Sequence, residues 1–210
     1  MLPAGFATAL ETNGYVVIDH FIPKPQCDEL VADVQSLIEQ VPEKSLSVSS
    51  HHWEKKSSSR AESQKATDYF LESADRVGFF MKQGFQLGGG PLGKYEGLGR
   101  IGYGIHTHRP AFRSATFTQK TRAVFTKLNF VKPVVVQSQF ISDAVGKHQD
   151  LTYMYVEPPE KLVSCWICLN DDKCDQCGFF LVPKSHKGYL VFPCFLRLEI
   201  SFVTKFSWTG

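Results

Sequence analysis

The stretch Lys132-Pro133-Val134-Val135-Val136-Gln137-Ser138-Gln139-Phe140-Ile141 marks the point where the pattern of this sequence changes. It is rich in β-branched and aromatic side chains, which favour extended strands. Short runs of the same kind follow at 151–156, 162–169 and 178–182, and two more lie in the tail. Short strands in the second half, after helical patterns in the first, predict a chain that is mostly β with flanking helices, as in a β-sandwich or jelly roll.

The first half shows helical and strand-like periodicity in separate segments. Apolar residues recur every three or four positions between Cys27 and Val41, which predicts a helix. Pro25 near its start and Pro42 after its end fit the positions that helices allow for proline. The other elements predicted here are a strand at 15–18 and helices at 68–85 and 116–128.

Two segments lack periodicity. Residues 43–66 mix serines with charged side chains and predict a mobile surface loop, in which 47–63 should be the most protease-sensitive stretch. The glycine-rich residues 88–93 predict a flexible connection. A phosphate-binding loop is not expected there, because no Lys-Ser/Thr pair follows the glycines.

Composition limits the class of protein. The chain has 210 residues, of which 43% are hydrophobic and 21% charged, and this suits a globular domain with a sizeable core. Its formal net charge is +2 without a long run of like charge, so neither a nucleic acid nor a membrane is an expected partner. The first residues lack the pattern of a secretory signal, which favours a cytoplasmic location. We expect a small-molecule substrate, and the oligomeric state stays open.

The six cysteines are more typical of reduced thiols than of a disulfide framework in a cytoplasmic chain. Cys165-x-x-Cys168 and Cys174-x-x-Cys177 could supply four thiolates to zinc. Only residues 169–173 lie between the pairs, however, whereas zinc ribbons separate theirs by roughly 15–20 residues. The first pair also lies in a predicted buried strand, where positions three apart point to opposite faces. Core or turn thiols are therefore favoured over a zinc site.

Histidines occur in two pairs that could suggest metal binding. His51 and His52 lie in the polar segment without an acidic or thiol partner nearby, which predicts a solvated pair. His106 and His108 could form one edge of a metal site. No carboxylate stands beside them, so a pair of turn histidines is favoured.

His148-Gln149-Asp150 is the strongest candidate for chemistry. Positions i and i+2 of an extended chain share one face, so the imidazole and the carboxylate can point into the same space. Two adjacent ligands of an octahedral metal need this arrangement, and a third would complete a 2-His-1-carboxylate set that leaves positions open for dioxygen and a co-substrate. A surface pair without function is the alternative. His186 is the candidate for the third ligand.

Several blocks of sequence, taken in order from about Gly14 to Gly188, resemble the phytanoyl-CoA dioxygenase family. The blocks are residues 13–18, 67–71 with 75–76 and 79–80, 134–138, 148–150, 155–158, 163–167 and 182–187. A series of blocks in a fixed order is more specific than any one of them. The resemblance implies a partial domain of this family over 1–188, followed by a non-matching apolar tail over 189–210.

The resemblance implies a double-stranded β-helix (jelly roll), incomplete at the C-terminus. It also implies Fe(II), with 2-oxoglutarate oxidised to succinate and carbon dioxide while a substrate C–H bond is hydroxylated, and with ascorbate as a candidate reductant. His148 and Asp150 are then the first two iron ligands. Arg100 would bind a carboxylate of the co-substrate, and Gln139 and Trp166 would line the same pocket. For Trp166 a core aromatic is the alternative.

The sequence departs from the family at two places. Residues 139–147 form a shorter segment than in relatives, without their glycine-rich loop. No counterpart of the family's distal histidine or of its co-substrate arginine is recognised after Gly188. His186 and Arg197 imitate the spacing of that pair, but the resemblance assigns His186 to a structural turn. We therefore expect an impaired 2-oxoglutarate-dependent hydroxylase. The alternative is an inactive truncated relative that acts as a binding protein or is a non-functional product.

Overall fold

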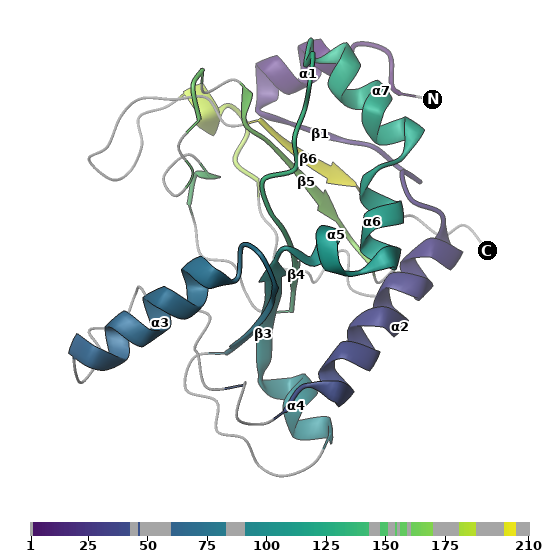
Figure 1. Cartoon of the computed structure of the whole chain (residues 1–210). Helices are drawn as coiled ribbons and strands as arrows, with labels where there is room; N and C mark the ends of the chain where they lie inside the picture. The colour runs from purple at the N-terminus through teal and green to yellow at the C-terminus, as the bar shows by residue number, and fades with distance from the viewer. Residues whose placement is uncertain are drawn as a thin grey trace. The chain divides into compact units, whose positions relative to one another are not determined.

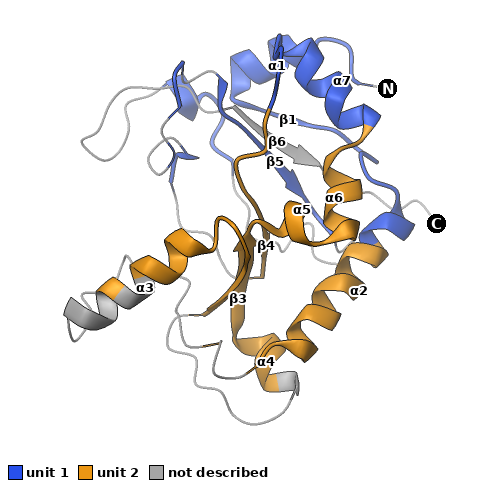
Figure 2. Ribbon diagram, viewed as in Figure 1, with its two compact units in different colours: residues 1–27, 119–133, 144–210 blue, residues 28–118, 134–143 orange. Residues whose placement is uncertain are grey.

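The computed structural model describes residues 2–42, 46, 60–82, 91–142, 148–150, 154, 156–158, 161–169, 181–187 and 200–204. The chain divides into two compact units (Figure 2). Unit 1 consists of residues 1–27, 119–133 and 144–210, and unit 2 of residues 28–118 and 134–143.

The described residues form helices and strands that are interspersed along the chain (Figure 1). The helices are α1 (Phe6–Asn13), α2 (Lys24–Gln40), α3 (Arg60–Glu72), α4 (Pro91–Gly97), α5 (Ile105–His108), α6 (Pro110–Thr116), α7 (Gln119–Lys127) and the 3-10 helix η5 (Ser185–Lys187). The strands are β1 (Tyr15–Val17), β2 (Val77–Met81), β3 (Leu98–Tyr103), β4 (Ser138–Ile141), β5 (Val163–Ile167) and β6 (Ile200–Thr204).

Unit 2 is built on the antiparallel sheet β2-β3-β4. Ile101 in the central strand pairs with Phe79 on one side and with Phe140 on the other. These three side chains pack with apolar residues of α2, so this helix covers one face of the sheet. The buried members of the cluster are Val34, Leu37, Ile38, Val41, Leu46, Met81, Leu98, Ile101 and Ile105. Removing such apolar surface from water, at roughly 25 cal/mol per Å², is what holds the sheet and the helix together.

Helix α2 confirms the prediction from apolar spacing. Pro25 lies in its first turn, where backbone N–H groups have no partner within the helix, so the N–H that proline lacks is not needed there. Leu30 and Val34, four positions apart, are both buried on its apolar face. Just after the helix, the carbonyl of Val41 accepts a hydrogen bond from Nζ of Lys94 at 2.8 Å, which satisfies one of the groups that a helix end exposes.

Unit 1 contains the parallel sheet β1-β6-β5. Ser201 of β6 pairs with Tyr15 of β1 on one side and with Ser164 of β5 on the other. The predicted strands at 15–18 and 162–169 are therefore present in slightly shorter form. The core of this unit combines residues of α1 and α7 with one that follows β1: Phe6, Leu10, Ile18 and Val124.

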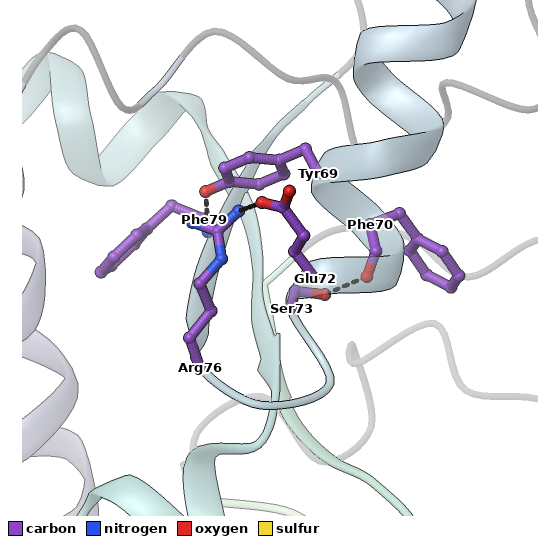
Figure 3. Close-up of polar contacts among 6 residues, drawn as sticks. All are labelled: Tyr69, Phe70, Glu72, Ser73, Arg76 and Phe79. Atoms are coloured by element: carbon purple, nitrogen blue, oxygen red, sulfur yellow. Dashed lines mark hydrogen bonds and ion pairs between the residues drawn. The ribbon is translucent and has the colours of Figure 1, made fainter.

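The predicted helix at 68–85 is wrong beyond Glu72, where α3 ends and is followed by β2. Ser73 closes the helix, because its Oγ donates a hydrogen bond to the carbonyl of Phe70 at 2.5 Å (Figure 3). The carbonyl of Ser73 then accepts the backbone N–H of Tyr103 in β3 at 2.9 Å. Pairing with β3 overrides the helical spacing, since a five-residue apolar segment fits either period.

Two other expectations about local structure change. The loop predicted at 43–66 ends earlier, because α3 begins at Arg60; residues 47–59 lie outside the described part of the chain. In the glycine-rich segment 88–93, α4 begins at Pro91. Helix α1 and strand β3 were not predicted at all. Within the described residues, no helix is long and apolar enough to cross a membrane.

The described residues do not form a chain that is mostly β. More of them lie in helices than in strands, and β1-β6-β5 is parallel, whereas a jelly roll is made of antiparallel strands. Within 132–141, the strand begins only at Ser138, and Val134 and Val136 are exposed. The described residues of 151–156 are not in a strand, and most of 178–182 lies outside the described residues. The structure supports helices combined with an antiparallel and a parallel sheet.

Candidate metal centre

His148 and Asp150 meet through their side chains in unit 1. Nε2 of His148 lies 3.1 Å from Oδ1 of Asp150, and the side chains are 25% and 14% exposed. The sequence predicted that the two would share one face of an extended strand. Neither His148 nor Gln149 is in a strand, but the two outer side chains still converge.

The His148–Asp150 pair suits two adjacent metal ligands. Two atoms bound about 2.1 Å from one metal ion at a right angle lie roughly 3.0 Å apart. The 3.1 Å between the imidazole nitrogen and the carboxylate oxygen is close to that separation, and it is also the length of a hydrogen bond between the two side chains. Among the described residues, however, no group of three or more His, Cys, Asp and Glu side chains could hold a metal ion. The donors that the structure describes are therefore a fitting pair rather than a set of three.

Asp150 is held on its other side by Ser164 of β5, whose Oγ donates a hydrogen bond to Oδ2 of the carboxylate. Side chains alternate along a strand, so Ser164 and Trp166 share one face of β5. The opposite face of this strand carries Val163, which packs on the core of unit 1. The structure thus brings Trp166 onto the same strand face as the serine that contacts the predicted ligand.

His186 lies in a setting that differs from that of His148 and Asp150. Its side chain is 2% exposed, and Nε2 donates a hydrogen bond to the carbonyl of Glu11 at 2.9 Å. This bond commits Nε2 to α1, in agreement with a structural turn. Ser185, the residue before His186, contacts the candidate centre, because Nε2 of Gln149 donates a hydrogen bond to its carbonyl at 2.9 Å. Arg197 lies outside the described residues.

Arg100 and Gln139, the remaining predicted site residues, lie in unit 2 on neighbouring strands. Gln139 of β4 pairs with Gly102 of β3, two positions from Arg100, so both side chains lie on one face of the antiparallel sheet. Arg100 also donates a hydrogen bond to Tyr103; burial raises the pKa of that phenol, and the guanidinium opposes the rise. The structure therefore brings Arg100 and Gln139 together in one unit, and His148, Asp150 and Trp166 in the other.

His106 is a buried structural residue. Its backbone N–H donates to Oγ of Ser138 at 2.8 Å, and its Nδ1 lies 2.6 Å from the same oxygen. The hydroxyl can donate to Nδ1 or accept from it, because the direction depends on the imidazole tautomer. Burial lowers the pKa of His106, and the nearby Arg113 and His108 lower it further. His106 and His108 both lie in the short helix α5 rather than in the predicted turn.

The described cysteines are free thiols. Cys27 is buried in α2. The surface of Cys165 as a whole residue is exposed in β5, but burial raises the pKa of its thiol to about 12, which agrees with the predicted buried strand. Cys168 follows the end of the strand. Cys174 and Cys177 lie outside the described residues, and the zinc alternative stays untested.

Neither the contact of Ser164 nor the link from Gln149 could be predicted directly from the sequence. Ser164 could have been suspected only from its position two residues before Trp166, since both then share one strand face. Nothing in the sequence connects it with Asp150, fourteen positions earlier. Contacts of this kind depend on how a loop crosses a strand.

Comparisons with known proteins agree with the resemblance seen in the sequence. The family profile described as phytanoyl-CoA dioxygenase matches residues 10–193. The chain is 30% identical over 185 residues to phytanoyl-CoA dioxygenase domain-containing protein 1 of Mus musculus, and 30% over 189 residues to that of Bos taurus. A phytanoyl-CoA dioxygenase of Arabidopsis thaliana is 27% identical over 188 residues.

These alignments cover most of this chain but a smaller share of the relatives. They include 84%, 85% and 86% of the chain, in the order given, and 62%, 63% and 63% of the three relatives. The chain thus spans less than two thirds of the length of the proteins that it matches.

Proposed function

This chain belongs to the phytanoyl-CoA dioxygenase family, and we propose that it carries part of an Fe(II)- and 2-oxoglutarate-dependent oxygenase site. The observation that supports this most directly is the 3.1 Å approach of His148 to Asp150, a spacing that suits two adjacent ligands of one metal ion. Fe(II) bound there would catalyse the oxidation of 2-oxoglutarate by dioxygen, and this oxidation would be coupled to hydroxylation of a small-molecule substrate. The family's double-stranded β-helix is part of this proposal.

The roles of the other residues follow from their chemistry. The guanidinium of Arg100 can bind a carboxylate in a bidentate manner, which suits 2-oxoglutarate. Gln139 lies on the same sheet face and offers an amide, and its Oε1 is buried without a hydrogen-bond partner among the described residues. Trp166 would provide an apolar wall. Each of these residues would bind or orient a ligand, and none would exchange a proton with it.

We further propose that this 210-residue chain turns over 2-oxoglutarate no faster than free iron does. Two protein ligands hold a first-row dication less firmly than three and leave its orientation unfixed. His186 is the last histidine of the sequence, and its Nε2 is bound to the carbonyl of Glu11. The distal carboxylate of 2-oxoglutarate, for which no counterpart of the family's arginine is recognised in this chain, would also be strongly disfavoured in a buried pocket.

A succinate-release assay with Fe(II), ascorbate and 2-oxoglutarate tests both statements. Mn(II) binding should be measured alongside, since it reports the ligand pair without turnover. We expect weak Mn(II) binding that His148→Ala and Asp150→Ala abolish, and succinate release at the level of iron alone. Equal Mn(II) binding by His148→Ala and the unchanged chain would refute the ligand assignment. Succinate release above that level, abolished by His148→Ala, would show instead that the site is complete.

A further inference from the structure

We propose that Ser164 is a positioning residue that selects which oxygen of Asp150 faces the metal. This inference rests on the proposed function, because it assigns a role to Ser164 only if Asp150 is a ligand. It concerns a contact that the sequence did not predict, between the middle of a strand and the carboxylate next to His148.

The two oxygens of Asp150 have different partners. Oδ2 accepts the hydroxyl proton of Ser164, whereas Oδ1 lies 3.1 Å from Nε2 of His148. A carboxylate is otherwise free to exchange its oxygens by turning about its last side-chain bond. With Oδ2 occupied by a hydroxyl donor, only Oδ1 is directed toward the imidazole. The hydrogen bond therefore favours binding through one defined oxygen.

Ser164 can perform this role because its own position is fixed. It lies at the second position of β5 and pairs with Ser201 of β6. Its neighbour Val163 packs on the core of unit 1, which anchors the strand from the opposite face. His148 and Gln149, by contrast, lie outside helices and strands. The hydrogen bond from Ser164 thus holds the carboxylate of Asp150 against a strand whose own position is fixed by the sheet and the core.

A second tether acts on the residue between the two predicted ligands. Nε2 of Gln149 donates to the carbonyl of Ser185 at 2.9 Å, in η5. This bond fixes the course of the backbone, while the bond from Ser164 fixes the rotation of the carboxylate. The two effects are separate, so a substitution at Ser164 should change metal affinity without loosening the segment as a whole.

The test is Mn(II) binding to the full 210-residue chain, followed by the electron paramagnetic resonance signal of free Mn(II). Loss of a hydrogen bond that orients a metal ligand weakens metal affinity about 10–100-fold, so we expect Ser164→Ala to weaken Mn(II) binding about tenfold. Ser164→Thr keeps the hydroxyl and should stay within about threefold of the unchanged chain. Thr126→Ala, which removes an exposed hydroxyl of α7 in the same unit, is the matched control and should have no effect.

The outcomes separate this inference from the proposed function. Equal Mn(II) affinities for Ser164→Ala and the unchanged chain, with binding abolished in His148→Ala, would overturn the role of Ser164 and leave the ligand pair standing. No Mn(II) binding by the unchanged chain would overturn both. The melting temperature of each metal-free variant shows whether it folds. If Ser164→Ala does not, Ser164→Cys keeps the volume with a weaker donor and should weaken binding in the same direction.

Discussion

A β-carbon placed on Gly14 would lie 2.4 Å from Nδ1 of His186. Gly14 ends α1 in the left-handed conformation, with φ at +83°, and its N–H donates to the carbonyl of Leu10 at 2.8 Å. The buried imidazole fills the space that a side chain would need, while its Nε2 binds the carbonyl of Glu11. The end of α1 and η5 therefore fit together only with glycine at this position.

Gly14→Ala should destabilise the protein far more than Gly5→Ala does. Gly5 also has a left-handed backbone, with φ at +71°, but its added β-carbon would meet nothing within 4 Å. We expect about 1 kcal/mol for Gly5→Ala, from the backbone alone, and about 2–4 kcal/mol for Gly14→Ala, from the backbone and the clash. Urea unfolding of the two variants measures the difference.

The clash can be isolated with a second substitution. In a His186→Ala background, Gly14→Ala should cost no more than Gly5→Ala, because the obstructing ring is gone. An unchanged cost of Gly14→Ala in that background would show that the imidazole is not the obstacle.

Asp33 and Arg109 should contribute a measurable coupling to the stability of unit 2. Nε of Arg109 donates to Oδ2 of Asp33 at 3.0 Å and Nη2 donates to Oδ1, a two-point contact between α2 and the start of α6. The side chains are 27% and 15% exposed for Arg109 and Asp33, and the hydrogen bond to Asp33 raises the pKa of the arginine. A double-mutant cycle should give about 1–2 kcal/mol, between the values for exposed and buried pairs.

The chain offers a matched control for this cycle in the same unit. Arg76 and Glu72 form an i, i+4 pair at 3.0 Å whose side chains are 42% and 69% exposed. Its coupling should be no more than about 0.5 kcal/mol. Arg109→Lys should recover little of the coupling to Asp33, because an ammonium group cannot make the two-point contact. Equal couplings for both pairs would contradict this argument.

The hydroxyl of Tyr69 should stabilise the junction between α3 and β2. It accepts the backbone N–H of Phe79 at 2.9 Å, and its ring faces the guanidinium of Arg76, whose Cζ lies 4.4 Å from the ring centroid (Figure 3). Tyr69→Phe leaves the amide without this acceptor and should cost about 1 kcal/mol in unfolding free energy. Tyr69→Leu also removes the ring contacts with Arg76 and Phe80, so it should cost more. A Tyr69→Phe variant as stable as the unchanged chain would contradict the assigned hydrogen bond.

Stability should fall in mildly acidic solution in a way that depends on His106. Its pKa in the folded protein is below the ordinary value of 6.5, so the unfolded chain binds a proton more readily than the folded one. The stabilisation is therefore present above about pH 6.5 and is lost as pH falls toward the lowered pKa. Unfolding free energies measured between pH 7.5 and 5.0 should decline less steeply for His106→Gln than for the unchanged chain. Parallel profiles would show that another group is responsible.

Apolar spacing was sufficient for α2 but not for β2, and the difference is physical. Helix α2 is long enough for its buried stripe to repeat several times, from Leu30 through Val34 to Leu37 and Ile38. The segment 77–81 is too short to show any period clearly, and it becomes a strand because β3 offers it backbone partners. In the sequence, β3 is separated from β2 by α4 and by the residues that precede α4. Local patterns contain no information about such pairings.

For the candidate site, the chemistry of the side chains predicted His148 and Asp150, but contacts between residues far apart in the sequence could not be predicted. The chemistry of an imidazole and a carboxylate two residues apart singled out His148 and Asp150, and their side chains do meet. Ser164 carried no such signal, because a serine in a strand suggests no ligand. Whether His186 could join the pair depended on the contact with Glu11, 175 positions earlier, which no local pattern could reveal.

The bond between Glu11 and His186 also sets an order of events during protein synthesis. Every residue of unit 2 lies before position 144, so a growing chain contains all of them while η5 has not yet been translated. Glu11 in α1 leaves the ribosome early but cannot bind His186 until the chain has grown by 175 further positions. The contact of α1 with η5 is thus among the last to form, whereas Phe6 and Leu10 can pack earlier with Ile18 and Val124.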